Sequence, residues 1–155
     1  MNSNFDDLLK DITNIKKTFR KLNYRVNVLY QTQREEKVVQ GYEKWRLSPE
    51  GGIDFVKKQL AILHHKCPVC HNPLTEKSAT IDHLHPKSKY LGMAIDENNM
   101  LILCNSCNAA KNNQEFEAWY SKLPLVWQER IDRAITEIHG TVKLAELLPS
   151  QFRNK

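Results

Sequence analysis

Two Cys-x-x-Cys pairs, Cys67–Cys70 and Cys104–Cys107, constrain this chain more than any other feature. This spacing lets two sulfur atoms reach one ion from a tight turn, and two such turns complete a tetrahedral four-thiolate shell. Because sulfur then fills every position, we expect a structural Zn2+ and not a catalytic one. The alternative is that the two Cys-x-x-Cys pairs are unrelated redox pairs or incidental cysteines that bind no common ion. His64, His65 and His71 flank the first pair, and we expect them to be surface or packing residues since the thiolate set is complete.

The composition fits one domain that does not cross a membrane. The 155 residues are 41% hydrophobic, enough for a core, and no apolar run reaches the roughly 18 residues of a bilayer helix. The N-terminus lacks the charged-then-apolar order of a secretory signal, so we expect a cytoplasmic protein. A net charge of +5 and a pI near 9.0 suit a nucleic-acid partner but also suit many proteins that have none.

A heptad pattern occupies the first part of the chain. The gaps between its apolar residues alternate between three and four, which predicts a helix over about residues 4–40. A stripe this narrow needs a cover, and we favour a second copy or a partner helix over the C-terminal helices of the same chain. We therefore expect residues 1–47 to serve interaction or dimerisation. The stripe consists of Phe5, Leu8, Ile12, Ile15, Phe19, Leu22, Val26 and Leu29, so the expected interface covers residues 5–29.

The same helix is locally basic. Between Asp11 and Glu35 the sequence has no acid but six lysines and arginines. These form either a stripe that follows phosphates or simply a solvated face.

Residues 48–155 are expected to form a mostly helical α+β domain. Gly41, Ser48–Pro49 and Gly51–Gly52 are expected to separate it from the long helix. We predict strands at 79–81 and 100–103, joined by a loop over 87–99, and helices at 53–64, 105–113, 115–120 and 125–139, with a last turn at 144–148.

The segment around the cysteine pairs resembles the HNH endonuclease motif. It contains Asp82-His83 with Pro86 and Ser88, then Asn99 before an apolar run, then Cys104-x-x-Cys107-Asn108-x-x-Lys111. The resemblance covers about residues 63–113 and implies a ββα-metal fold braced by a four-cysteine zinc. The interval from Asn99 to Asn108 is similar to that in the HNH domain of RNA-guided CRISPR nucleases, which also ends the motif with Asn.

The resemblance implies a role for each motif residue. His83 would be the general base, Asp82 and Asn108 would hold a divalent metal, and Asn99 would steady the loop and orient His83. The chemistry agrees, because a neutral imidazole accepts a proton near pH 7 and two hard oxygen ligands suit Mg2+ or Mn2+. The implied reaction is hydrolysis of DNA that leaves 5′-phosphate and 3′-hydroxyl ends.

Several assignments stay open in the sequence. Asn98 competes with Asn99, which we choose because it directly precedes the strand. His85 is a second candidate ligand, base or phosphate contact, or merely a histidine outside the site. Lys87, Lys89 and Lys111 are candidate phosphate contacts or solvated lysines.

Two functions compete. The first is a DNA endonuclease, which would suit a phage packaging complex or a bacterial defence system. The alternative is a non-catalytic, zinc-stapled nucleic-acid-binding or interaction subunit. We favour the enzyme, because a pure binding module has no need for Asp82, His83 and Asn108 together.

Overall fold

The computed structural model describes residues 3–149, with side chains from residue 8 onward. Its contacts divide the chain into two compact units, Met1–Val38 and Val39–Lys155. None of the helices among the described residues is long and apolar enough to cross a membrane.

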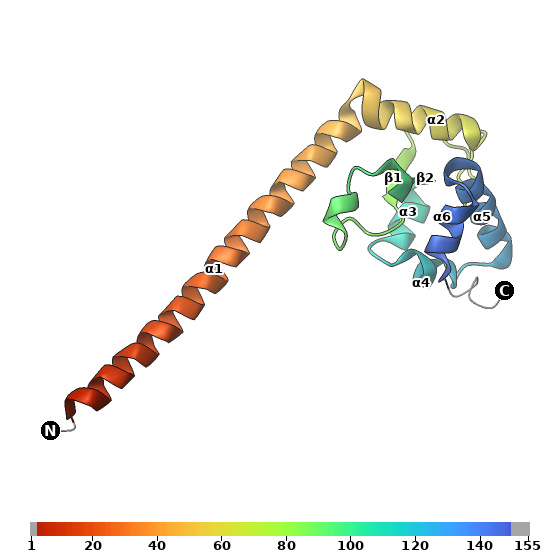
Figure 1. Ribbon diagram of the computed structural model, residues 1–155. Helices are drawn as coiled ribbons and strands as arrows, with labels where there is room; N and C mark the ends of the chain where they lie inside the picture. Colours follow the sequence, from red (N-terminus) through yellow and green to blue (C-terminus); the bar gives the residue numbers. More distant parts are fainter. Residues whose placement is uncertain (1–2, 150–155) are drawn as a thin grey trace. The chain divides into compact units, whose positions relative to one another are not determined.

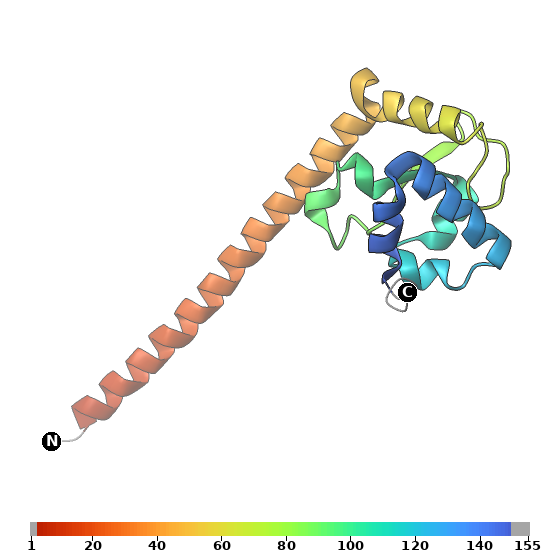
Figure 2. The ribbon, with the colours of Figure 1, turned by 45° about the vertical axis from the view of Figure 1, so that its right-hand side comes forward.

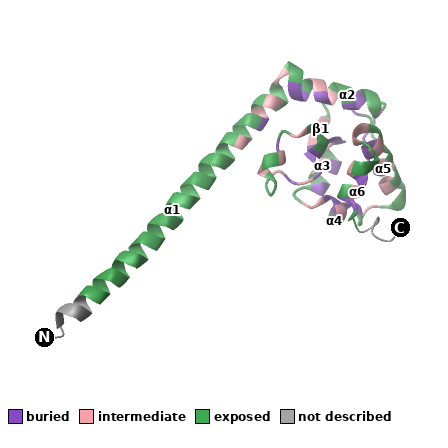
Figure 3. Cartoon of the chain, in the orientation of Figure 1, coloured by how far each residue is buried: buried purple, intermediate pink, exposed green. Residues whose placement is uncertain are grey.

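One helix, α1 (Ser3–Leu47), fills the first unit and continues into the second. It passes through Gly41, so the prediction that this glycine ends the helix is wrong. From Leu8 to Leu29 the apolar stripe is exposed, at 39% for Ile12 and 67% for Ile15 (Figure 3). The side chain of Phe5 lies outside the described residues. Exposed leucines and isoleucines at this spacing leave a continuous apolar face without a cover in one copy of the chain.

The second unit contains a small hairpin surrounded by helices (Figure 1). After α1 its elements are η1 (Pro49–Ile53), α2 (Asp54–Ile62), β1 (Ala79–His83), η2 (Leu91–Met93), η3 (Glu97–Asn99), β2 (Met100–Cys104), α3 (Asn105–Lys111), α4 (Phe116–Tyr120), α5 (Leu125–His139) and α6 (Thr141–Leu147). The mostly helical α+β fold class is confirmed.

Strands β1 and β2 pair antiparallel, from Ala79 opposite Cys104 to His83 opposite Met100. Both strands lie where the sequence predicts them. Residues 100–103 are all buried, because α2 and α3 both contact β2 (Figure 2). The hairpin therefore carries a cysteine at one end and His83 at the other.

The helices after α3 complete the core. Helix α5 ends at Gly140, whose φ of 87° is a conformation that other residues rarely adopt. The predicted turn at 144–148 is part of α6, which packs on α5 and buries Leu144 and Leu147.

Gln59 on α2 completes the outer edge of β2. Its Oε1 accepts a hydrogen bond from the Ile102 N–H at 2.8 Å, and its Nε2 donates to the Met100 carbonyl at 3.3 Å. The side chain is 2% exposed and takes the place that a third strand would occupy. The Met100 carbonyl also accepts a hydrogen bond from His139 Nε2 at 2.8 Å.

We predict that Gln59→Leu lowers the free energy of unfolding by about 2 kcal/mol, because it leaves the buried Ile102 N–H without an acceptor. Urea denaturation followed by circular dichroism measures this. The matched control is Lys57→Leu on the same helix, at an exposed position, which is expected to change stability by less than about 0.5 kcal/mol. Equal stability of the two variants would contradict the role of Gln59.

Candidate active site and metal centre

The four cysteines form one cluster. Their Sγ atoms all lie within 4.8 Å of one another, and the Sγ atoms of Cys70 and Cys104 are 3.6 Å apart. A tetrahedral zinc with Zn–S bonds of 2.3 Å places sulfurs about 3.8 Å apart, so the cluster fits Zn2+. Burial, together with the charge of Cys67, raises the pKa of the Cys107 thiol. Four thiolates this close need a cation among them to ionise together.

The fold brings these cysteines together from two places. Cys67 and Cys70 lie on a turn, which we call the knuckle (residues 64–74), closed by a hydrogen bond from the Cys67 N–H to the Asn72 carbonyl at 2.9 Å. Cys104 ends β2, and Cys107 lies in the first turn of α3. The knuckle histidines 64, 65 and 71 are exposed, and the cluster contains only cysteines among the described residues. A zinc ion would thus join the knuckle to the junction of β2 and α3.

Asp82 is buried with Lys111. The carboxylate is 5% exposed and the lysine 1%, and Lys111 Nζ lies 3.0 Å from Asp82 Oδ2 and 3.3 Å from Oδ1. Nζ also donates to the His83 carbonyl at 2.6 Å. The prediction of Lys111 as a phosphate contact therefore does not match the structure. Two polar partners inside the domain hold this ammonium away from the surface.

The Asp82 carboxylate already has a cation, the Lys111 ammonium, beside both of its oxygens. Burial raises the pKa of its carboxyl to about 6, against the lowering effect of Lys111, so it is largely ionised at pH 7. Oδ2 is close to Lys111 Nζ but receives no hydrogen bond from any described residue. The Lys111 ammonium therefore balances this carboxylate, and a Mg2+ or Mn2+ ion would have to share Asp82 with it.

His83 is held as a neutral imidazole. Its Nε2 lies 3.0 Å from the Ala94 carbonyl, which can only accept, so Nε2 carries the proton and Nδ1 has the free lone pair. Burial lowers the pKa of His83 below its ordinary 6.5. The ring is therefore unprotonated at neutral pH, as a general base must be.

Asn108 shares a pocket with His83. The pocket has a volume of about 340 Å³. Thr80 Oγ1 donates to the Leu103 carbonyl at 2.9 Å, so it accepts from Asn108 Nδ2 at 3.0 Å. This pair fixes the amide with its oxygen opposite to Thr80. The other lining residues are Tyr42, Ile81, Pro86, Lys87, Asn105, Ala109, Asn112 and Asn113. Asp82, the neighbour of His83 in the sequence, does not line this pocket. Its carboxylate is buried against Lys111 instead.

Asn99 holds the chain that follows His83. It is fully buried, its Oδ1 accepts from the His85 N–H at 2.8 Å, and its Nδ2 donates to the His85 carbonyl at 3.0 Å. Nδ2 also lies 3.4 Å from the carbonyl of Met93, next to the Ala94 that holds the imidazole. Asn98 is exposed. The geometry thus favours Asn99 for the loop-steadying position.

The remaining candidates separate into two groups. Lys87 lines the pocket, with its ammonium 4.0 Å from the centre of the Tyr42 ring. Lys89 instead pairs with Glu115 at 2.9 Å, and His85 Nδ1 lies 3.9 Å from the same carboxylate. His85 and Lys89 are not among the residues that line the pocket of His83.

Comparison with known protein families finds a match within the second unit. Residues 67–114 match a family described as HNH endonuclease. This segment is an HNH domain. Among solved structures, the chain is similar to the Type II-C Cas9 enzyme from Actinomyces naeslundii, with 16% sequence identity and a TM-score of 0.43. That similarity covers 83% of this chain and 14% of the other. No curated protein matches the chain.

One residue outside the matched segment contacts the HNH site and escaped the sequence analysis. Tyr42 near the end of α1 is 4% exposed, and its ring lies 5.1 Å from that of His83. Trp45 on the same helix packs on Phe55 at 5.8 Å. The sequence signal was the spacing of Val38, Tyr42 and Trp45 by four and three, which continues a helical face past Gly41.

We predict that Cys104→Ser prevents the HNH domain from binding zinc and from folding, because three thiolates no longer close the shell. Elemental analysis is expected to give about one zinc per wild-type chain and a much smaller amount for the variant, with loss of the helical circular dichroism of residues 39–149. Ser106→Ala, at an exposed position between the two cysteines, is the matched control. A folded, metal-free Cys104→Ser protein would refute the structural role.

Proposed function

We propose that this protein is a metal-dependent endonuclease that hydrolyses phosphodiester bonds of DNA. The observation that carries the proposal is the pocket in which His83, with Nδ1 as its basic nitrogen, meets Asn108. An HNH-type nuclease activity agrees with the matched family. DNA, the residue roles and the working metal are part of the proposal.

The chain's own residues would act as follows. His83 Nδ1 takes a proton from the water that attacks phosphorus, and the Ala94 carbonyl keeps the ring oriented through Nε2. Asn99 Nδ2 contacts the Met93 carbonyl and so supports the loop that carries Ala94. Lys87 offers its ammonium to a phosphate oxygen at the pocket.

Asp82 and Asn108 would hold Mg2+ or Mn2+. Bound there, such an ion supplies charge stabilisation for the leaving 3′ oxygen. Asp82 is ionised above its pKa of about 6, so the carboxylate becomes a weaker ligand as the pH falls through that value. Lys111 neutralises the same carboxylate and shares it with any cation that binds.

We further propose that residues 5–29 pair with a second copy of the chain or with a partner helix. The supporting observation is the exposed stripe from Leu8 to Leu29. A subunit of a phage or bacterial defence complex would use such a helix for assembly. The non-catalytic alternative would retain the helix and the zinc but not need the pocket.

We predict that His83→Ala lowers Mg2+-dependent nicking of supercoiled plasmid by at least about 100-fold, because no other group in the pocket takes the proton. Zinc content and DNA binding are expected to stay close to wild type. Gel assays with Mg2+, Mn2+ or no added divalent ion measure the cleavage. Below the lowered pKa of His83 the imidazole becomes protonated, so wild-type activity is expected to fall in acid and persist at pH 7.

The matched comparisons are Asn108→Ala and His85→Ala. The first removes a proposed metal ligand, and we expect lost activity that returns in part at high Mn2+. The second changes a histidine that does not line the pocket, and we expect activity within a few-fold of wild type. Full cleavage by His83→Ala would instead favour a different base, and inactivity of the wild-type protein on every DNA form would favour the binding module.

We predict that Ile15→Lys with Leu22→Lys reduces the mass measured by analytical ultracentrifugation from dimer to monomer, because charges replace two exposed stripe residues. The matched control, Asn14→Lys with Gln31→Lys, adds the same charge away from the stripe. A dimer that persists in the stripe variant would exclude this interface, and a wild-type monomer would favour a partner helix.

A further inference from the structure

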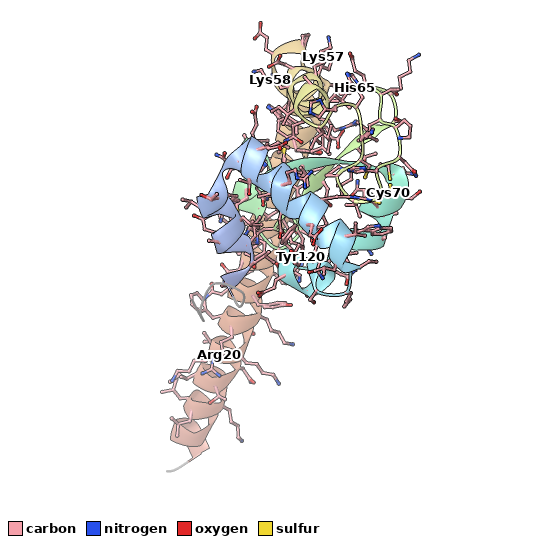
Figure 4. The ribbon with its side chains drawn as sticks, turned by 90° about the vertical axis from the view of Figure 1, so that its right-hand side faces the viewer. Arg20, Lys57, Lys58, His65, Cys70 and Tyr120 are labelled. Atoms are coloured by element: carbon pink, nitrogen blue, oxygen red, sulfur yellow. The ribbon has the colours of Figure 1, made fainter. Side chains whose placement is uncertain are left out.

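A second groove lies on the side of the knuckle that faces α5. It has a volume of about 260 Å³ and shares no lining residue with the pocket of His83. We call it the knuckle groove and define it by His64, Lys66, His71, Arg130, Arg133 and Glu137. Figure 4 looks onto α5, with the knuckle and its labelled Cys70 beside it.

The charges around the knuckle groove are not balanced. The lining contains three basic residues, Lys66, Arg130 and Arg133, and Glu137 is its one acid. Among the described side chains, from residue 8 to residue 149, no carboxylate lies within ion-pair distance of any of these three cations, whereas Lys57, Lys58 and Lys89 each have a carboxylate partner. Three unpaired cations around one concave surface repel each other unless an anion joins them.

The frame of the knuckle groove is well anchored. Arg130 Nη1 lies 3.3 Å from the Val69 carbonyl, which ties α5 to the knuckle. Val69 and Cys67 are almost completely buried, and Ala134 on α5 is 3% exposed. An anion would therefore meet cations on a surface that is already formed, while Lys66 and Arg133 remain exposed at its rim.

We propose that the knuckle groove binds a backbone phosphate of DNA other than the scissile one. Arginine and lysine side chains are the usual partners of phosphate oxygens in such complexes. This rests on the proposed function, because it takes DNA as the ligand. It adds a second contact at the cysteine end of the hairpin, while the chemistry takes place at the His83 end.

The competing explanation is that these cations balance the zinc centre. Four thiolates and one Zn2+ carry a net charge of −2, and Cys67 lines the same groove. Under that explanation, loss of the cations would weaken zinc binding and leave DNA affinity unchanged. The two explanations therefore differ in what a neutral substitution changes.

The test uses the full-length, zinc-loaded protein and a fluorescent 20-base-pair DNA duplex without added Mg2+, so that binding is measured whether or not the protein cleaves. Lys66→Gln with Arg133→Gln removes two exposed charges and leaves Arg130 in place. Lys57→Gln with Lys58→Gln, also labelled in Figure 4, removes the same charge from α2 outside the groove.

We expect the groove variant to bind at least about 10-fold more weakly at 0.1 M salt, and the slope of log K against log [salt] to shrink by about 2. The control pair is expected to change the slope by less than half as much, and both proteins are expected to keep one zinc per chain. Equal losses in the two variants would overturn the proposal, as would lost zinc with an unchanged slope. The same titrations with an RNA duplex of the same length test the choice of ligand. If the groove substitutions weaken binding to RNA and not to DNA, DNA is the wrong ligand.

Discussion

The register between β1 and β2 is the constraint on which the rest of the second unit depends. Side chains alternate between the faces of a strand, so a slip by one residue would exchange the faces of Ile81 and Asp82. In the observed register, Ile81 and His83 line the pocket, while Thr80 and Asp82 bond Asn108 and Lys111 of α3. The cysteine cluster holds the other end of the hairpin against the same helix. The strand pairing and the cysteine cluster together determine which side chains of the hairpin meet α3 and which line the pocket.

The buried pair of Asp82 and Lys111 is a costly way to hold a carboxylate. Removing two charges from water costs several kcal/mol per ion, and the contacts of Lys111 with Asp82 and with the His83 carbonyl offset this only in part. The pKa of Asp82, raised to about 6, records the remaining penalty. An apolar pair of the same volume would stabilise the fold at least as well, so stability alone does not explain these residues. The role proposed for Asp82, a negatively charged metal ligand, would give the buried charge a function.

Much of the fold followed from the sequence because the strong signals were local. The strands, the cysteine cluster and the helices on either side of Pro124 depend on spacing and on breakers that act within a few residues. The misses depend on tertiary contacts. Gly41 does not end α1 because Tyr42 and Trp45 pack on the core and offset its low helix propensity. The sequence alone predicts a surface position for Lys111, because its burial depends on the ion pair with Asp82, which is distant in the sequence.

Gln59 has a consequence beyond the bond energies of its amide. A two-stranded ribbon exposes backbone donors and acceptors along both margins, and such margins recruit extended segments from other molecules. At Ile102 and Met100 the donor and acceptor are already taken by side chains of α2 and α5. The β2 edge of the hairpin is thereby protected against aberrant strand addition, a safeguard that larger sheets obtain from charged or proline-bearing borders.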